Sequence, residues 1–221
     1  MKSLLLLIII FFTSLFTLGQ DPYFQQKVNT YIEVELDDGA HFLRGFEKLI
    51  YHNNSPKKLD SILIHLWPNA YKNSQTELAK QKFDNGNASF RYASEKDLGF
   101  IDSLNFKVDG EKSTWNFFNN KIDISVIYLK KSLNPGDSII ITTPFRVKIP
   151  SGRFSRLGHI GQSYQITQWF PKPAVFDKSG WHPMSYLNQG EFYSEYGNYD
   201  VNITLPENYA VSYTHLRAHE T

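Results

Sequence analysis

The sequence predicts a mainly β fold, a β-sandwich or saddle-shaped mixed sheet with very little helix. Aromatic residues make up 15% of its 221 residues, and short segments of alternating polarity are separated by turn residues. Aromatic and β-branched side chains favour strands, and many short strands with turns between them are typical of a sandwich or a related β architecture. No internal repeat or low-complexity segment interrupts residues 20–210, so we expect one domain there.

The first expected strand shows the pattern most clearly. Residues 28–36 alternate apolar and polar side chains with period 2, which indicates a half-buried strand. Asp37-Asp38-Gly39 then predicts a hairpin turn, because Gly39 tolerates a positive φ. The other expected strands span residues 42–52, 59–67, 98–108, 113–118, 121–128, 138–149 and 198–205.

Two turns and one helix complete the regular elements. Asp109-Gly110 and Asn134-Pro135-Gly136-Asp137 are strong turn signals between strands. Residues 74–83 have apolar side chains at helical spacing and predict one or two turns of helix. Residues 150–161 contain three glycines and two arginines, and we expect a surface loop there.

This loop leads into the most unusual segment, Gln162–Pro183. It holds two of the four tryptophans and three prolines. Pro171 and Pro173 each remove a backbone donor and fix φ, so Phe170–Ala174 is not expected in a central strand. Aromatic packing would have to hold such a segment while its polar groups point to a defined place. A loop that faces a substrate on a β scaffold has this character.

The first 19 residues read as a signal peptide rather than as part of the fold. A single lysine, Lys2, precedes the apolar run Leu4–Phe16, and small residues follow up to Gly19. The run is short for a membrane span of about 20 residues. We therefore expect an exported protein, periplasmic, bound to the cell envelope or secreted, with no stable membrane span after cleavage.

Residues 211–221 read differently from the rest of the domain. The alternation stops, and the text VSYTHLRAHET is what a transposase-type sequencing adapter encodes in one frame. We interpret these residues as an artefact and the native protein as truncated near Tyr209. The pair His219-Glu220 is accordingly assigned no function.

Composition and motifs exclude several classes of function. With 23 basic and 22 acidic residues and no basic run, nucleic acid is a poor partner. Cysteine is absent, and neither a Gly-x-Ser-x-Gly elbow nor a phosphate loop occurs. Zinc needs three or four converging ligands, so we expect none bound by this chain and no catalytic set within it. The histidines outside the two ends are scattered, at His41, His52, His65, His159 and His182.

Five segments in order carry a family resemblance. Together they are similar to the N-terminal domain of aminopeptidase N-type zinc metallopeptidases, and most of all to a secreted bacterial branch. They extend over nearly all of residues 23–210. The segments are Tyr23–Asp38 (YFQQKVNTYIEVELDD), Gly45–Pro56 (GFEKLIYHNNSP), Ile62–Tyr71 (ILIHLWPNAY), Thr167–Pro183 (TQWFPKPAVFDKSGWHP) and Gly190–Pro206 (GEFYSEYGNYDVNITLP).

The resemblance implies a larger enzyme. In the family a β saddle packs on a thermolysin-like domain that carries a His-Glu-x-x-His zinc helix and a Gly-x-Met-Glu-Asn strand. Both motifs would lie downstream of residue 210. The implied cofactor is therefore zinc in the complete enzyme, and the implied partners are a peptide substrate and the missing catalytic domain. This fragment alone is expected to be inactive.

One substrate-binding residue carries over to this chain. The family places a Thr-Gln dipeptide where the N-terminal domain helps to hold the substrate's free α-amine, and here this is Thr167-Gln168. An amide oxygen can accept a hydrogen bond from an ammonium group, so Gln168 is the candidate. Many relatives have Gln or Glu two residues later, where this chain has Phe170. A polar residue bonded only to backbone is the alternative interpretation of Gln168.

Two other interpretations of the whole chain stay open. One is a stand-alone secreted β-sandwich module that binds carbohydrate or protein, with exposed aromatic residues in Trp169–Trp181 as the platform. The other is a non-enzymatic homologue with broken zinc ligands. Extending the reading frame past Tyr209 separates them, because a His-Glu-x-x-His motif indicates the enzyme and a natural stop codon favours the module.

Overall fold

The computed structural model describes residues 23–190 and 192–210, and this part is mainly β. The expected signal peptide, 1–19, and the expected artefact, 211–221, lie outside the described residues. One α-helix, α2 (Glu77–Asp84), and one 3-10 helix, η1 (Trp67–Tyr71), accompany the strands. The strands are β1 (Lys27–Asp37), β2 (Phe42–His52), β3 (Leu59–His65), β4 (Phe100–Asp102), β5 (Lys107–Val108), β6 (Glu111–Lys112), β7 (Thr114–Phe118), β8 (Lys121–Leu133), β9 (Ser138–Lys148), β10 (Gly158–Ile160), β11 (Ser163–Gln165), β12 (Lys172–Pro173), β13 (Val175–Asp177), β14 (Gly180–His182) and β15 (Gly197–Thr204).

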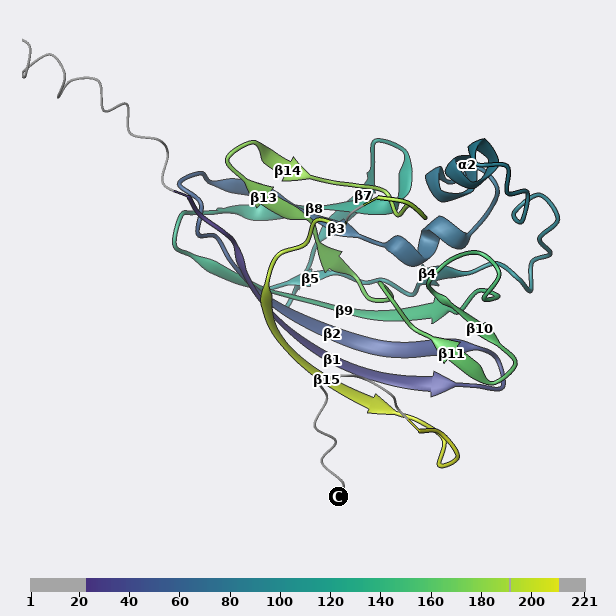
Figure 1. Cartoon of the computed structure of the whole chain (residues 1–221). Coiled ribbons are helices and arrows are strands. Elements are labelled where there is room, and N and C mark those ends of the chain that lie inside the picture. The colour runs from purple at the N-terminus through teal and green to yellow at the C-terminus, as the bar shows by residue number, and fades with distance from the viewer. Residues whose placement is uncertain (1–22, 191, 211–221) are drawn as a thin grey trace, which may run out of the picture.

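Two sheets form the two layers of the domain. The larger sheet has the order β15-β1-β2-β9-β5-β6, with β4 also paired to β9. Its long strands curve along the lower side of Figure 1, and the smaller sheet, β12-β3-β8-β7, lies above them. Two separate hairpins, β10–β11 and β13–β14, complete the strand pairing. The prediction of a mainly β, sandwich-like domain with little helix is confirmed.

Strand β1 is the second strand from one edge of the larger sheet, between β15 and β2. Its buried and exposed residues alternate from Val28 to Leu36, as the sequence predicts. It pairs antiparallel with β2 and parallel with β15, so the last described strand closes beside the first. A parallel neighbour from the other end of the chain is a feature that local alternation cannot predict.

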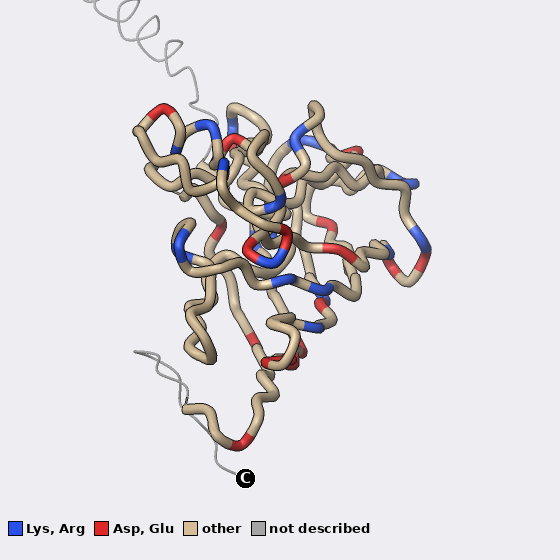
Figure 2. The backbone as a smooth tube through the Cα atoms, turned by 90° about the vertical axis from the view of Figure 1, so that its right-hand side faces the viewer, with Lys and Arg blue, Asp and Glu red and all other residues tan. Residues whose placement is uncertain are grey.

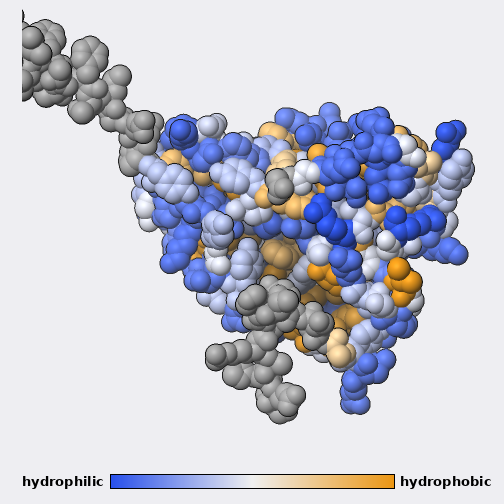
Figure 3. All heavy atoms as spheres, in the orientation of Figure 1, coloured by the Kyte–Doolittle hydropathy of each residue, from blue (hydrophilic) through white to orange (hydrophobic). Residues whose placement is uncertain are grey.

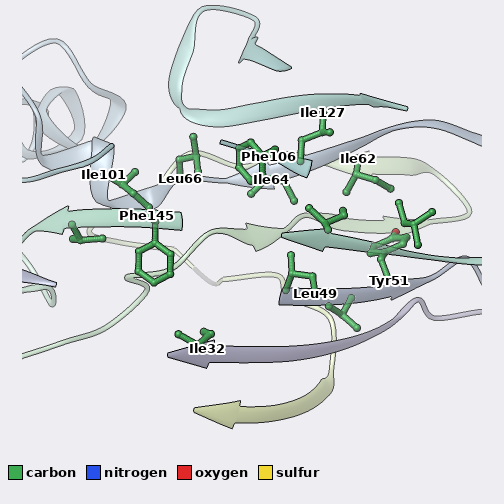
Figure 4. Close-up of a cluster of buried hydrophobic side chains, with 14 of the residues drawn as sticks. Ile32, Leu49, Tyr51, Ile62, Ile64, Leu66, Ile101, Phe106, Ile127 and Phe145 are labelled. Carbon is green, nitrogen blue, oxygen red and sulfur yellow. The ribbon is translucent and has the colours of Figure 1, made fainter. Parts of the chain in front are cut away.

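The main core lies between the two sheets. Ile32 and Leu49 come from the larger sheet, and Ile62 and Ile127 come from the smaller one. Figure 4 shows their side chains pointing toward one another across the layers. Each such burial stabilises the fold by roughly 1.5–3 kcal/mol. Since the chain contains no cysteine, this burial takes the place of disulfide cross-links.

The structure corrects three details of the expected strands. The first hairpin takes its positive φ at His41 (56°) rather than at Gly39, because Asp37 Oδ1 accepts from the Ala40 amide at 3.0 Å and delays the reversal. The expected strand 98–108 is broken at Ser103, whose φ is 61°. The third strand ends at His65, and the chain then enters the 3-10 helix.

Two expected turns and the expected helix are present, but one expected loop contains a strand. Asp109 (φ 50°) and Gly110 (φ 84°) form the turn that their sequence predicts, and Gly136 (φ 81°) does so in the next one. The expected helix is present as α2, capped by the Thr76 side chain, which accepts from the backbone amide of Ala79 at 3.3 Å. The expected loop 150–161 contains strand β10 instead of being wholly irregular.

Charged residues of both signs are mixed in the described part, and apolar residues gather on one of its faces. Figure 2 shows basic and acidic positions interspersed along the backbone in that view, without a stripe of one sign. Figure 3 shows apolar residues gathered in the middle of one face, with hydrophilic residues over most of its rim. Of the helices within residues 23–190 and 192–210, none is long and apolar enough to cross a membrane.

Candidate functional site

The segment from Thr167 to Pro183 joins the edge of the smaller sheet. Strand β12 pairs with the end of β3, which places Lys172 opposite His65 and Pro173 opposite Ile64. The next backbone amide, that of Ala174, donates to the Leu63 carbonyl at 2.8 Å. Because each proline lacks an amide hydrogen, β12 is a two-residue edge strand, as the prolines predict.

Gln168 lies just before this edge strand with an unusual backbone. Its φ is 53°, in the left-handed region that residues other than glycine rarely adopt. Its side-chain oxygen accepts a hydrogen bond from Lys172 Nζ at 2.9 Å, and the same Nζ donates to Ser194 Oγ at 2.9 Å. Lys172 Nζ also lies 4.5 Å from the centre of the Trp67 ring, a cation–π contact.

The surroundings of Lys172 are largely dry. Burial lowers the pKa of Lys172 to about 8. His65, across the β3–β12 pairing, has its pKa lowered to about 3, mainly by burial and further by the charge of Lys172. His65 is therefore neutral at physiological pH, and its Nε2 accepts from the Met184 amide at 3.2 Å. This neutral acceptor fits the structural role expected of a strand histidine.

The aromatic residues of the segment hold it in place. Trp169 packs 5.8 Å from the Phe145 ring of the larger sheet, and Phe170 packs 5.2 Å from Trp169 and 6.1 Å from Tyr199, measured between ring centres. The ring centres of Trp181 and Phe176 lie 5.0 Å apart. The rings of Trp169, Phe170, Phe176 and Trp181 are buried or half-buried against the core rather than exposed, so they do not form an open platform.

The other histidines do not assemble a metal centre. His41 stacks on His159 with ring centres 3.7 Å apart, and His182 Nε2 lies 2.8 Å from Asp177 Oδ1. Within the described ranges, no three histidine, aspartate or glutamate side chains converge as metal ligands would. The described residues therefore present no ligand set for zinc.

A buried carboxyl lies elsewhere on the inner face of the larger sheet. Glu47 of β2 is 1% exposed, and neither carboxyl oxygen has a hydrogen-bond partner among the described residues. It pairs in register with Ile32 and Thr143, and burial raises its pKa well above the ordinary value. Burial and, to a lesser degree, the charge of Glu47 raise the pKa of Tyr199, which packs on Phe170. No hydrogen bond among the described residues joins Glu47 to Gln168, so we treat Glu47 as a cost to stability rather than as part of the site.

A cavity of about 590 Å³ is also separate from Gln168, which is not among its lining residues. It lies between the β5–β6 turn and the β8–β9 turn. Lys112, Lys130 and Lys131 line it together with Glu111 and further acids, and Lys130 is already paired with Glu111 at 2.6 Å. Balanced surface charges of this kind give no ligand preference, and we assign the cavity no function.

Gln168 as a substrate-binding residue stays a prediction, and the sequence did not point to the two residues whose side chains share its hydrogen-bond network. Lys172 lies four positions after Gln168, between Pro171 and Pro173, which is the one local signal that could have pointed to it. Ser194 comes from the connection before β15, and only the folded chain brings it to Lys172. Phe170, the departure from the family pattern, packs against Tyr199.

Comparisons with known proteins give a limited result. No family model and no curated protein matches the chain. Among solved structures, the chain is similar to a mutant M1 zinc metallopeptidase from Deinococcus radiodurans bound to Tyr-Ser-Ala (TM-score 0.45, 12% identity, 92% of this chain and 37% of that one). It is also similar to a yeast LTA4 hydrolase (TM-score 0.34, 12% identity, 58% and 17%). The chain thus spans well under half of these proteins, and such low scores do not assign it to a family.

Proposed function

We propose that this chain is the N-terminal β domain of an exported zinc aminopeptidase, a peptidase that removes residues from the amino terminus of peptides. One observation carries the proposal: the five family-like segments fold together as neighbours. The first, second and last supply β1, β2 and β15, adjacent strands of the larger sheet. The third and fourth supply β3 and β12, adjacent strands of the smaller sheet.

In this proposal the domain contributes a substrate contact and not the chemistry. Gln168 is the residue that meets the peptide, on a backbone that the β12 pairing and the aromatic packing hold in place. The described residues offer no ligand set for zinc. Zinc and its ligands would belong to the continuation of the chain beyond Tyr209, together with the surface that docks on this domain.

Recovery of the uncontaminated gene tests the proposal. The reading frame is expected to continue past Tyr209 and to encode His-Glu-x-x-His with a downstream glutamate. The exported full-length protein should hydrolyse amino-acid anilides and lose this activity with a chelator, whereas the 221-residue chain should show none. A natural stop codon after the present C-terminal residues, or a continuation without zinc ligands, would refute the proposal.

A second candidate, a carbohydrate-binding module, is favoured by one specific pocket. A shallow pocket of about 390 Å³ is lined by Gln25, Gln26, Asn29, Asn198 and Tyr196, among others, at the start of β1 and β15. Tyr196 is 84% exposed. Amides and the ammonium group of Lys27, beside an open aromatic ring, suit the hydroxyl groups of a sugar.

Titration with neutral oligosaccharides tests this second candidate. Binding should disappear in Tyr196→Ala and persist in Tyr23→Ala, since Tyr23 is similarly exposed at 89% but does not line the pocket. Equal binding of the oligosaccharide by the two variants would show that this pocket is not the binding site.

A further inference from the structure

A stacked pair of histidines joins the β10–β11 hairpin to the β1–β2 turn. The hairpin is a two-stranded sheet of its own, and its tip lies beside that turn (Figure 1). The ring centres of His41 in the turn and His159 on β10 lie 3.7 Å apart, with 20° between the ring planes. Tyr164, opposite His159 in the hairpin, brings its hydroxyl within 2.7 Å of His41 Nδ1. The residues between them, 160–163, are exposed.

The backbone is fixed on both sides of this contact. The His41 carbonyl accepts from the Ile149 amide at 2.9 Å, which ties the turn to the end of β9. The His159 amide donates to the Pro150 carbonyl at 3.0 Å, and the His159 carbonyl accepts from the Gly152 amide at 2.8 Å. Since these bonds bring the rings face to face, a repulsion between the rings acts directly on the position of the hairpin.

The stack suits neutral rings and is opposed by two charged ones. Two positive charges this close together repel each other. Burial, and after it the charge of His159, lower the pKa of His41. The hydrogen bond to Tyr164 is less sensitive to a proton, because a charged His41 ring can still donate from Nδ1 to the phenol oxygen. The proton-sensitive contact is therefore the pair of rings.

The acids of the turn offset this repulsion only in part. Asp38 and Asp37 act to raise the pKa of His41, but burial and His159 outweigh them. The Asp37 carboxylate is already paired with Arg44 at 3.1 Å. The other titratable groups of this cluster are the phenols of Tyr164 and Tyr209, the second of which donates to Asp38 Oδ2 at 3.0 Å. Burial raises the pKa of both phenols, so they stay neutral in the range where histidine titrates.

We infer that the His41–His159 stack is a pH-sensitive latch, which fixes the β10–β11 hairpin on the β1–β2 turn when the rings are neutral and releases it when both are protonated. Strand β11 ends at Gln165, and the chain then runs directly to Gln168. Release of the hairpin therefore frees the segment that enters the candidate site. The latch goes beyond the proposed function and does not depend on it.

The lowered pKa of His41 sets the direction of the switch. A released His41 ring takes up its proton at a pKa of about 6.5, whereas the stacked ring takes it up only at lower pH. The released form thus binds more protons below this value, and acid favours it. The latch should be closed above about pH 7 and open progressively as pH falls below 6.5.

Amide hydrogen exchange of the full 221-residue chain, followed by NMR from pH 7.5 to pH 5.0, tests the latch. After correction for intrinsic exchange rates, the amides of β10 and β11 should lose at least tenfold in protection over this range. The amides of β1 and β2 should change by a smaller factor, because the larger sheet stays closed. The ring resonances of His41 and His159 should titrate as a coupled pair, in two separated steps.

Two variants and a control make the result specific. His159→Gln removes one of the two charges and keeps a planar polar group, so hairpin protection should vary less than threefold over the same range. His41→Asn does the same from the turn, where asparagine tolerates the φ of 56°. His52→Gln should keep the wild-type response, since His52 lies at the opposite end of β2 from the turn. A folded spectrum of each variant is required, and His41→Asn decides if His159→Gln does not fold.

The latch is overturned if hairpin protection in the wild type is the same at pH 7.5 and 5.0. Retention of the tenfold loss by His159→Gln or His41→Asn overturns it too, because the loss would then not come from the pair. An equal loss in β1 and β2 would show acid unfolding of the whole domain instead of a local release. None of these results bears on the peptidase proposal, which the continuation of the gene tests separately.

Discussion

Replacing Glu47 by methionine should stabilise the domain. The wild-type carboxyl is buried between the sheets without a hydrogen-bond partner among the described residues, and a buried polar group left unpaired costs about 1–3 kcal/mol. Methionine has similar length and no polar oxygen, so Glu47→Met recovers that cost while filling the same space. For a domain of roughly 150–250 residues, a gain of about 2 kcal/mol raises Tm by about 4–8 °C.

The pH dependence of the gain identifies its cause. Burial raises the folded-state pKa of Glu47, so the carboxyl is neutral in both states at low pH and carries no ionisation penalty there. As pH rises through its unfolded pKa of about 4.3, the unfolded chain releases the proton first, and the wild-type fold loses stability up to the higher folded pKa. The advantage of Glu47→Met should therefore be smallest near pH 4 and grow toward pH 8.

Urea and thermal unfolding from pH 4 to 8, followed by circular dichroism, measure this difference. Glu33→Met is the matched control, because Glu33 is exposed on the other face of the adjacent strand β1. It should change stability by less than about 0.5 kcal/mol. If Glu47→Met melts below wild type at pH 7, or if its advantage is the same at every pH, the carboxyl has a partner and the reasoning fails.

Three other changes test the packing and the polar contacts. Asn53→Ala should cost about 3 kcal/mol in urea unfolding, since its buried amide oxygen accepts three hydrogen bonds and its nitrogen donates two; a cost below 1 kcal/mol would contradict this. Gly45→Ala should cost about 1–3 kcal/mol because its new Cβ would lie 2.4 Å from Phe145 Cζ, and an unchanged midpoint would show that the ring moves freely. The pKa of His41 is lowered by burial and by the neighbouring His159, so stability should fall as pH drops below about 6.5, and His159→Gln should reduce that fall.

The strands of the larger sheet were predictable because one face of each is buried and the other is not. Val28 to Leu36 alternate in the sequence and alternate in burial in the fold. The break at Ser103 was not predictable, because apolar residues lie on both sides of it and the positive φ there leaves no mark in the pattern. The parallel pairing of β1 with β15 depends on contacts between the two ends of the domain, which local periodicity does not encode.

For the candidate site, the sequence names Gln168 as a prediction but does not say which end of its amide is occupied in the fold. Gln168 carries both an acceptor and a donor, and which one meets a ligand depends on what occupies the other. In this fold the oxygen has a partner, because the ammonium group of Lys172 can only donate and does so to the amide oxygen of Gln168. A family pattern that fixes the residue type is compatible with either orientation. The contact made by this amide therefore has to be argued from its neighbours in the fold, and here those neighbours are a largely buried cation and a serine from a distant connection.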